Sequence, residues 1–198
     1  MKIINILGSP RKNGASARIA RAFAETAVDL GATVRDYHLN TMHYQGCQAC
    51  EGCHTRADRC VLRDDLSPLL ADLHTAEIVL FSSPIYFGDT SGQFKCFFDR
   101  MWSLVRTDAR DGESSSRLPP GKTAVLILSQ VETSEAHQEV QERYTMHLDI
   151  HEFKVRVISA AGNRLQSDTD VSPCLHQAIG LARELLQAPC PGVAFSRP

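Results

Sequence analysis

The sequence lacks any apolar run long enough to cross a bilayer, since spanning takes about 18 consecutive apolar residues. It also lacks a marked excess of either charge: 21 Lys and Arg against 23 Asp and Glu give a net charge of −2. So small a charge gives no indication of nucleic acid or an anionic membrane as an obligatory partner, and we expect neither. The N-terminal residues, with one lysine and a brief apolar run, have no signal-peptide pattern, so we expect none.

Two nucleotide-binding motifs are absent as well. No G-x-G-x-x-G follows the first predicted strand, residues 2–7, which argues against a classical dinucleotide-binding fold. The loop after this strand is not a P-loop, because five residues separate Gly8 from Gly14 and the next residue is Ala15 rather than lysine.

Cysteine is present in an odd number, seven, and is unevenly placed. Four lie within 14 positions, and Cys96, Cys174 and Cys190 are scattered. A secreted disulfide framework is usually more regular and shorter, so we expect a reducing, cytoplasmic setting.

The order of the predicted elements indicates the fold class. Five short apolar strands alternate with amphipathic helices; the strands are expected at 2–7, 33–39, 78–82, 123–128 and 153–159, and the helices at 15–30, 67–74, 91–105, 135–150 and 172–186. This alternation predicts an α/β protein with a doubly wound, five-stranded parallel sheet in the flavodoxin-like order 2-1-3-4-5. We expect one domain over 1–188 and a flexible C-terminal tail over 189–198.

Ligands of such a sheet bind beyond the carboxyl ends of its strands. The loops expected at this edge are 8–16, 40–60, 83–90 and 129–133, so the clustered cysteines are expected there too. The first loop joins a strand to a helix N-terminus, which attracts anions. Its side chains suit a phosphate: Ser9 and Ser16 offer hydroxyls, Asn13 an amide and Arg11 a planar fork. The alternative is a plain turn with an Asn-Gly bend and a serine cap.

The sequence GSPRKNGAS over 8–16 resembles the corresponding loop of the NAD(P)H-dependent FMN reductase and iron-sulfur flavoprotein families, both flavodoxin-like. The resemblance continues through SPIYFGDTSGQFK at 83–95 and FDR at 98–100, and so covers about the first hundred residues. It implies that the FMN phosphate is held by Ser9, Arg11, Asn13 and Ser16. Ala15 departs from the Asn common in these families. The resemblance also implies a homodimer or homotetramer, with 91–105 and 107–121 as candidate contacts.

The loop after the third strand suits a flat heterocycle. Pro84 stiffens the loop, and Gly88 allows close approach of the main chain to a ligand. A stacking surface is offered by Ile85, Tyr86 and Phe87, one apolar and two aromatic side chains. The resemblance assigns this loop to the flavin ring. Residues 129–133, which begin with Ser129 directly after the fourth predicted strand, are expected to border the ring. The alternative is an ordinary loop whose aromatic side chains are buried in the core. We expect no catalytic acid or base, because flavin chemistry can proceed without one.

The clustered cysteines have the spacing C-x2-C-x2-C-x6-C, formed by Cys47, Cys50, Cys53 and Cys60. So compact a run is typical of a [4Fe–4S] cluster, whereas zinc usually takes two pairs separated by a longer arm. It also resembles the cysteine motif of iron-sulfur flavoproteins. Free thiols, a redox pair and zinc ligands are the alternatives. Asp99 and Arg100 are interpreted as structural, in an ion pair or a subunit contact.

Three functions follow. The first is an FMN oxidoreductase that exchanges electrons with a small-molecule or protein partner through a [4Fe–4S] cluster, with NAD(P)H as a possible donor. The second is a cluster-free NAD(P)H-dependent reductase of quinones, azo or nitro compounds, or free flavin. The third is a non-enzymatic electron carrier of the flavodoxin type, which usually has a strongly acidic docking face that a net charge of −2 does not favour.

Overall fold

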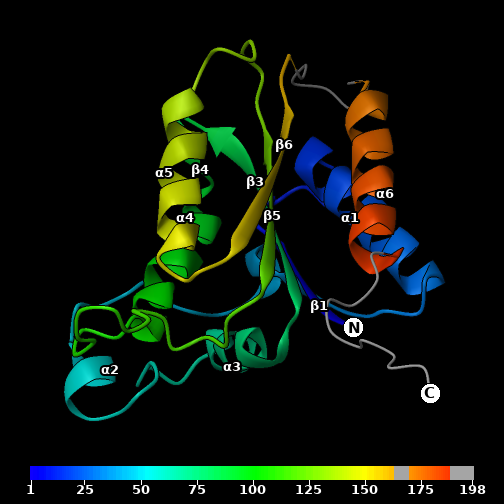
Figure 1. The fold of residues 1–198 in the computed structure, drawn as a ribbon. Helices are drawn as coiled ribbons and strands as arrows, with labels where there is room; N and C mark the ends of the chain where they lie inside the picture. Colours follow the sequence, from blue (N-terminus) through cyan, green and yellow to red (C-terminus); the bar gives the residue numbers. More distant parts are fainter. Residues whose placement is uncertain (163–169, 188–198) are drawn as a thin grey trace, which may run out of the picture.

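The computed structural model describes residues 1–162 and 170–187. Its parallel strands are β1 (Lys2–Leu7), β2 (Thr33–His38), β3 (Ile78–Tyr86), β5 (Thr123–Ser129) and β6 (Lys154–Ala160), in the spatial order β2-β1-β3-β5-β6 (Figure 1). The three central strands are buried along almost their whole length, as apolar strands covered on both faces should be. The α/β class and the succession of the parallel strands agree with the sequence prediction.

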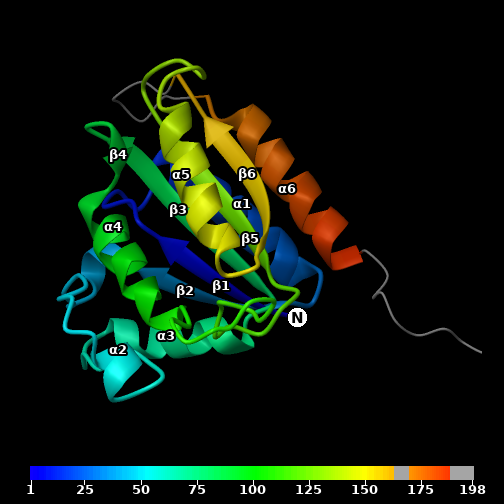
Figure 2. The same cartoon turned by 60° about the vertical axis from the view of Figure 1, so that its left-hand side comes forward.

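Helices cover both faces of the sheet (Figures 1 and 2). On one face lie α1 (Ala15–Asp29) and α6 (Ser172–Gln187); on the other lie α4 (Gly92–Arg100) and α5 (Gln138–Asp149). Helix α3 (Leu66–Thr75) and the single turn α2 (Gly52–Thr55) lie at the end of the molecule where β1 begins. Each layer of helices packs against the sheet to form its own hydrophobic core. Ile19 and Phe23 of α1 belong to one core, and Phe94 of α4 belongs to the other.

The predicted number of strands, five, is wrong, because a short sixth strand pairs antiparallel with β3. This strand, β4 (Asp89–Thr90), forms a hairpin with the end of β3, so most of the loop expected at 83–89 is extended and paired. The turn consists of Phe87 and Gly88, whose φ angles are 51° and 84°. Positive φ at both central residues is the geometry of a type I′ hairpin turn.

Other differences concern the helix ends. Helix α4 stops at Arg100 and a 3₁₀ turn, η2 (Met101–Leu104), replaces the last turn of the expected helix. Helix α5 begins later than expected, because His137 just before it has a positive φ of 60°. A second 3₁₀ turn, η1 (Leu39–Thr41), follows β2. The expected tail at 189–198 lies outside the described residues.

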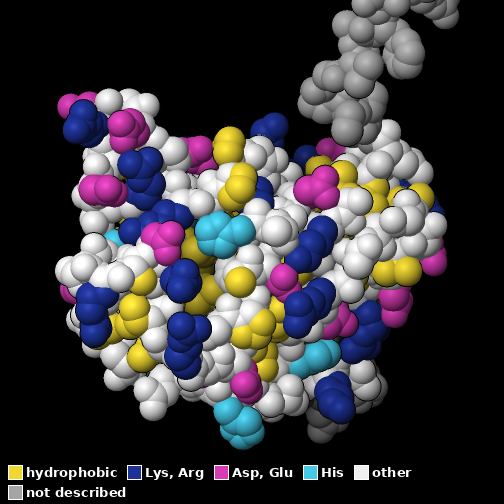
Figure 3. Space-filling model, turned by 90° about the horizontal axis from the view of Figure 1, so that it is seen from below, with side chains coloured by type: hydrophobic (Ala, Val, Ile, Leu, Met, Phe, Trp, Pro, Cys, Tyr) yellow, Lys and Arg dark blue, Asp and Glu magenta, His cyan; other side chains and the backbone are white. Residues whose placement is uncertain are grey.

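The end of the molecule that carries α2 and α3 shows no surface of a single charge. Lys and Arg side chains lie there beside acidic, histidine and hydrophobic ones (Figure 3). Within residues 1–162 and 170–187, none of the helices combines the length and apolarity that a membrane crossing needs.

Candidate cofactor site

The loop after β1 keeps the N-terminus of α1 available to an anion. Gly14 is the N-cap of α1 and no side chain caps this end of the helix. The amide of Gly14 donates to the carbonyl of Arg11 over 3.1 Å, and the amide of Arg11 donates to Ser9 Oγ over 3.2 Å. The hydroxyl of Ser16 is buried and has no hydrogen-bond partner in the structure. An unpaired buried hydroxyl beside an uncapped helix end fits a phosphate group.

Close contacts fix the shape of this loop. A Cβ atom on Gly14 would lie 2.8 Å from Ser9 Oγ, so a larger residue would displace that hydroxyl. Arg21, two turns into α1, donates to the main-chain carbonyl of Lys12 over 2.8 Å and lies 3.4 Å from Asn13 Oδ1. This bracing role of Arg21 was not predicted, because nothing in the loop motif points to it.

The β3–β4 hairpin presents aromatic surface at the same edge of the sheet. Phe87 at its tip is fully exposed and Tyr86 is 42% exposed, so these rings do not fill the core. Ile85 is half-buried and packs against the core below. Pro84 pairs in register with Ser129, the last residue of β5, which is 7% exposed. The structure therefore brings together the residues predicted to flank a flavin ring.

A polar clamp from α5 holds the hairpin. The hydroxyls of Tyr144 and Thr90 lie 2.6 Å apart, and Tyr144 also donates to Asp89 Oδ1 over 3.0 Å. Arg143 forms an ion pair of 2.8 Å with the other oxygen of Asp89. Burial of the phenol, together with the nearby Asp89, raises the pKa of Tyr144, so the group stays a neutral donor. This clamp is not predictable from local patterns, because more than fifty residues separate its two halves, 89–90 and 143–144.

Ser91, at the start of α4, connects the loop after β1 with the end of β3. Its hydroxyl donates to the carbonyl of Gly8 over 2.6 Å and caps α4 by accepting from the amide of Phe94 over 3.3 Å. Its own amide donates to Ser83 Oγ over 3.0 Å. A Cβ on Gly8 would lie 2.8 Å from Phe94 Cβ and 2.9 Å from the carbonyl oxygen of Ser82. The close approach of the main chain at residue 8 to α4 and β3 therefore requires glycine.

The cysteine loop begins at this edge and then runs along α4 away from it. Gln93, in the first turn of α4, bonds to Asn40 over 2.8 Å and accepts from the Tyr44 hydroxyl over 2.7 Å. Arg100, at the last turn, donates to the carbonyl of Gln45 over 2.9 Å. The nine residues of α4 span about 13 Å at 1.5 Å per residue. The prediction that the cysteines share the edge with the other loops is therefore wrong: they lie at the far end of α4.

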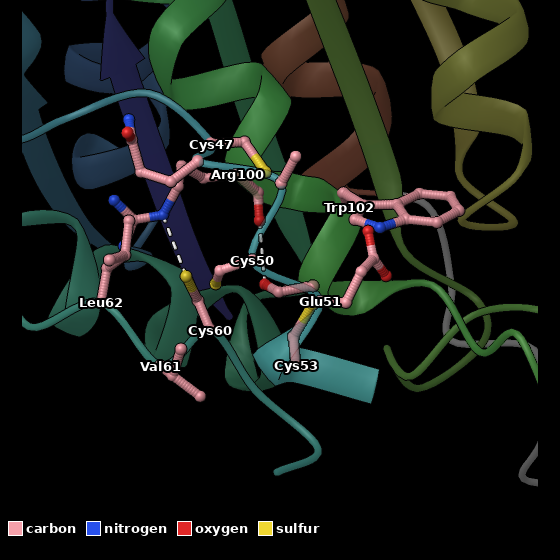
Figure 4. Close-up of a pocket in the computed structure, with 12 residues that line it drawn as sticks. Cys47, Cys50, Glu51, Cys53, Cys60, Val61, Leu62, Arg100 and Trp102 are labelled. Carbon is pink, nitrogen blue, oxygen red and sulfur yellow. Dashed lines mark hydrogen bonds between the residues drawn. The ribbon is translucent and has the colours of Figure 1, made fainter. Parts of the chain in front are cut away.

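All four clustered cysteines line one pocket there, together with Glu51, Arg100 and Trp102 (Figure 4). The thiols differ in exposure: Cys47 and Cys50 are exposed, Cys60 is half-buried and Cys53 is buried. The chain turns sharply between them, with positive φ at Ala49 and Glu51. Burial raises the pKa of the Cys53 thiol.

A buried guanidinium supports this pocket. Arg100 is 1% exposed and forms an ion pair of 2.7 Å with Asp64, while its Nε–H donates to Cys60 Sγ over 3.0 Å. Burial raises the pKa of Asp64, but the hydrogen bonds from Arg100 and from the amide of Gln45 outweigh it and leave that pKa below its usual value. The ion pair expected for Arg100 is present, and Asp99 pairs instead with Lys95 over 2.5 Å.

The pocket matches a metal cluster in its donor chemistry. Four thiols within one short segment are the ligand set of an iron–sulfur cube. As the side chains lie, no three His, Cys, Asp or Glu residues in the described part of the chain are arranged to hold a metal ion. The cavity volume is about 20 Å³, enough for one or two waters, so a cluster would need a different arrangement of the thiols.

The sheet order, the uncapped α1 terminus and the aromatic hairpin are those of a flavodoxin-like α/β protein, a fold whose ligands bind beyond the carboxyl ends of its strands. The chain belongs to the NADPH-dependent FMN reductase family, whose model matches residues 1–162.

Curated relatives match a shorter part of the chain. An iron-sulfur flavoprotein of Archaeoglobus fulgidus is 33% identical over 101 residues, which are 51% of this chain and 46% of that protein. An iron-sulfur flavoprotein of Methanosarcina thermophila is 32% identical over 106 residues, 54% of this chain and 55% of that protein. The matches thus span about half the length of these relatives.

Solved structures share the fold over almost the whole chain. The NAD(P)H:quinone oxidoreductase of Methanothermobacter marburgensis superposes with a TM-score of 0.71 at 18% identity, covering 93% of this chain and 96% of that one. An FMN-dependent NADH-azoreductase of Bacillus anthracis gives 0.61 at 13% identity, covering 94% and 96%. At such identities the likeness shows the fold alone.

Proposed function

We propose that the protein transfers electrons between FMN and a [4Fe–4S] cluster held by Cys47, Cys50, Cys53 and Cys60. The observation that carries the proposal is that all four thiols line one pocket, with the buried cation of Arg100 beside one sulfur. The curated relatives described above are named iron-sulfur flavoproteins, which supports the same assignment. Bound FMN supplies two-electron chemistry and the cluster supplies one-electron chemistry.

In this proposal the loop after β1 binds the FMN phosphate. Ser9, Arg11, Asn13 and Ser16 surround it, and the N-terminus of α1 adds its partial positive charge. The flavin ring lies against the hairpin formed by Pro84, Ile85, Tyr86, Phe87 and Gly88, and Ser129 borders it. The unpaired hydroxyl of Ser16 and the exposed ring of Phe87 are the contacts that FMN would complete.

The proposed partners are electron donors and acceptors. NAD(P)H is the possible electron donor, and a small molecule or an electron-transfer protein is the acceptor. We also propose a homodimer or homotetramer, since Phe87 and the 43% exposed Trp102 offer apolar surface that a second copy can cover.

A cluster-free NAD(P)H-dependent reductase is the second candidate. It is favoured by the small cavity between the cysteines and by the fold shared with a quinone oxidoreductase and an azoreductase. In that case the thiols take no part in binding iron, and FMN exchanges electrons directly with quinones, azo or nitro compounds, or free flavin. A non-enzymatic carrier has less support, because such a carrier usually has a strongly acidic docking face and the net charge of this chain is only −2.

The deciding experiment is a visible absorption spectrum with iron and acid-labile sulfide assays on protein purified without oxygen. Flavin bands with about four irons per chain support the cluster. Flavin bands without iron or sulfide, both before and after anaerobic reconstitution, would contradict the cluster and support the cluster-free reductase. As a matched pair of variants, Cys60→Ser is expected to lose iron and Cys174→Ser, at the start of α6, to keep it.

A further inference from the structure

Arg100 carries a full charge in a site that excludes water. Its side chain is 1% exposed at the last residue of α4, and a buried charge is tolerated only when its donors are matched by acceptors. Two groups match part of the guanidinium: Asp64 accepts from both terminal nitrogens over 2.7 and 3.3 Å, and the Gln45 carbonyl accepts over 2.9 Å.

The third nitrogen, Nε, has a different acceptor. It donates to Cys60 Sγ over 3.0 Å, and Figure 4 shows this bond at the wall of the pocket. A protonated thiol is a weak acceptor, whereas a cysteinate that binds iron carries negative charge and accepts strongly. The geometry therefore matches a Cys60 sulfur that serves as a metal ligand.

Cys60 differs in this respect from its neighbours in the motif. Across residues 1–162 and 170–187, it is the one member of the four whose sulfur accepts a hydrogen bond from a cationic side chain. Cys47 and Cys50 are exposed, so water solvates them. The ion pair with Asp64 also fixes the guanidinium, so the donor stays in place without the side-chain disorder of a surface arginine.

We propose that Arg100 sets the reduction potential of the cluster through its hydrogen bond to Cys60. This inference rests on the proposed function. One-electron reduction adds a negative charge that the ligand sulfurs share, and hydrogen bonds to these sulfurs are a known determinant of the potential. A buried donor with a positive charge stabilises the reduced form, so Arg100 raises the potential. Arg100 is a positioning residue, because it touches a ligand of the cluster and not the cluster.

The test compares two variants with a charge control. Arg100→Lys keeps the charge and the partner Asp64, but one ammonium cannot reproduce the fork to Asp64 and Cys60 together. Because a neutral residue alone would leave Asp64 unpaired, the second variant is the double substitution Asp64→Asn with Arg100→Met, which removes both charges. Lys95→Met is the control: it removes a positive charge from an exposed position of the same helix.

The measurement is the midpoint potential of the cluster, followed by electron paramagnetic resonance in an anaerobic redox titration, on preparations with equal iron and FMN content. We expect the potential to fall in Arg100→Lys and in the double variant, and to stay at the wild-type value in Lys95→Met.

Two results would overturn the inference, and they can be told apart. An unchanged potential in fully loaded Arg100 variants overturns the role of Arg100 and leaves the proposed function intact. A wild-type protein that holds FMN but binds neither iron nor sulfide after reconstitution overturns the cluster itself, and the role of Arg100 with it.

Discussion

The hydroxyl of Ser91 donates a hydrogen bond of 2.6 Å to the main-chain carbonyl of Gly8, although 83 positions separate the two residues. This bond ties the first turn of α4 to the loop proposed to bind the FMN phosphate. The same serine accepts from the amide of Phe94 and so caps the helix. This side chain thus joins the phosphate loop to the start of α4, next to the hairpin.

Ser91→Ala is expected to weaken both folding and flavin binding. The variant loses a helix cap and leaves the buried carbonyl of Gly8 without this donor, at a cost of about 1–2 kcal/mol in the free energy of unfolding. Urea unfolding gives the stability, and quenching of FMN fluorescence gives the dissociation constant. Ser134→Ala, at an exposed loop position, should change neither.

Gly14→Ala tests the phosphate contact separately from the ring contact. The new methyl group would press on Ser9 Oγ, which is 2.8 Å away, and so would displace a proposed phosphate ligand. We expect FMN affinity to fall at least tenfold, about 1.4 kcal/mol, and riboflavin affinity to change little, since riboflavin has no phosphate. An equal loss for both flavins would contradict the assignment. Gly180→Ala in α6, where the added methyl meets no atom within 4 Å, is the control.

Tyr144→Phe should loosen the hairpin from α5. The substitution removes the bonds to Thr90 and Asp89 and keeps the aromatic ring that packs against Phe94 and Phe98. We expect a loss of about 1–2 kcal/mol in stability and faster hydrogen exchange at the Asp89 and Thr90 amides. Met146→Leu, at an exposed position of the same helix, should leave both quantities unchanged.

His151 should make the fold sensitive to mild acid. It is 5% exposed, and burial followed by the charge of His147 lowers its pKa from 6.5 to about 4. Because the unfolded chain takes up the proton more readily, stability is complete above pH 6.5 and falls as the pH drops toward 4. The full loss is at most about 3 kcal/mol.

Urea unfolding between pH 7.5 and 4.5, with FMN saturating at each pH, measures this dependence. In His151→Leu the slope between pH 6.5 and 4.5 should flatten. The same slope in the variant would assign the acid sensitivity to other groups. Asp64 and Asp72 act in a different window, because their lowered pKa values make them lose stability only as the pH falls through the carboxylate range.

The sheet could be read from the sequence because its central strands are short, continuous apolar runs between helical patterns. Such patterns are local, so strands at 78–82 and 123–128 are predictable; in the structure these strands extend over Ile78–Tyr86 and Thr123–Ser129. The hairpin was missed because it depends on a positive φ at Phe87, which no local propensity favours in an aromatic residue.

The candidate site was predictable to the extent that its residues are adjacent in sequence. The phosphate loop, the hairpin residues and the cysteine motif are contiguous segments, whereas their supports come from elsewhere in the chain. Arg100 contacts Cys60 and Asp64 because it lies at the end of α4 opposite Ser91. The direction in which the cysteine loop runs along α4 cannot be predicted from the spacing of its residues.

Helix α4 has one end on the phosphate loop, through Ser91, and the other on the cysteine pocket, through Arg100. The nine residues of α4 form one continuous helix, so a displacement of one end would be transmitted to the other. If FMN and the cluster each bias the position of this helix, their affinities are linked, and each must change the other by the same factor. The fraction of the protein that binds one cofactor would then depend on whether the other is bound.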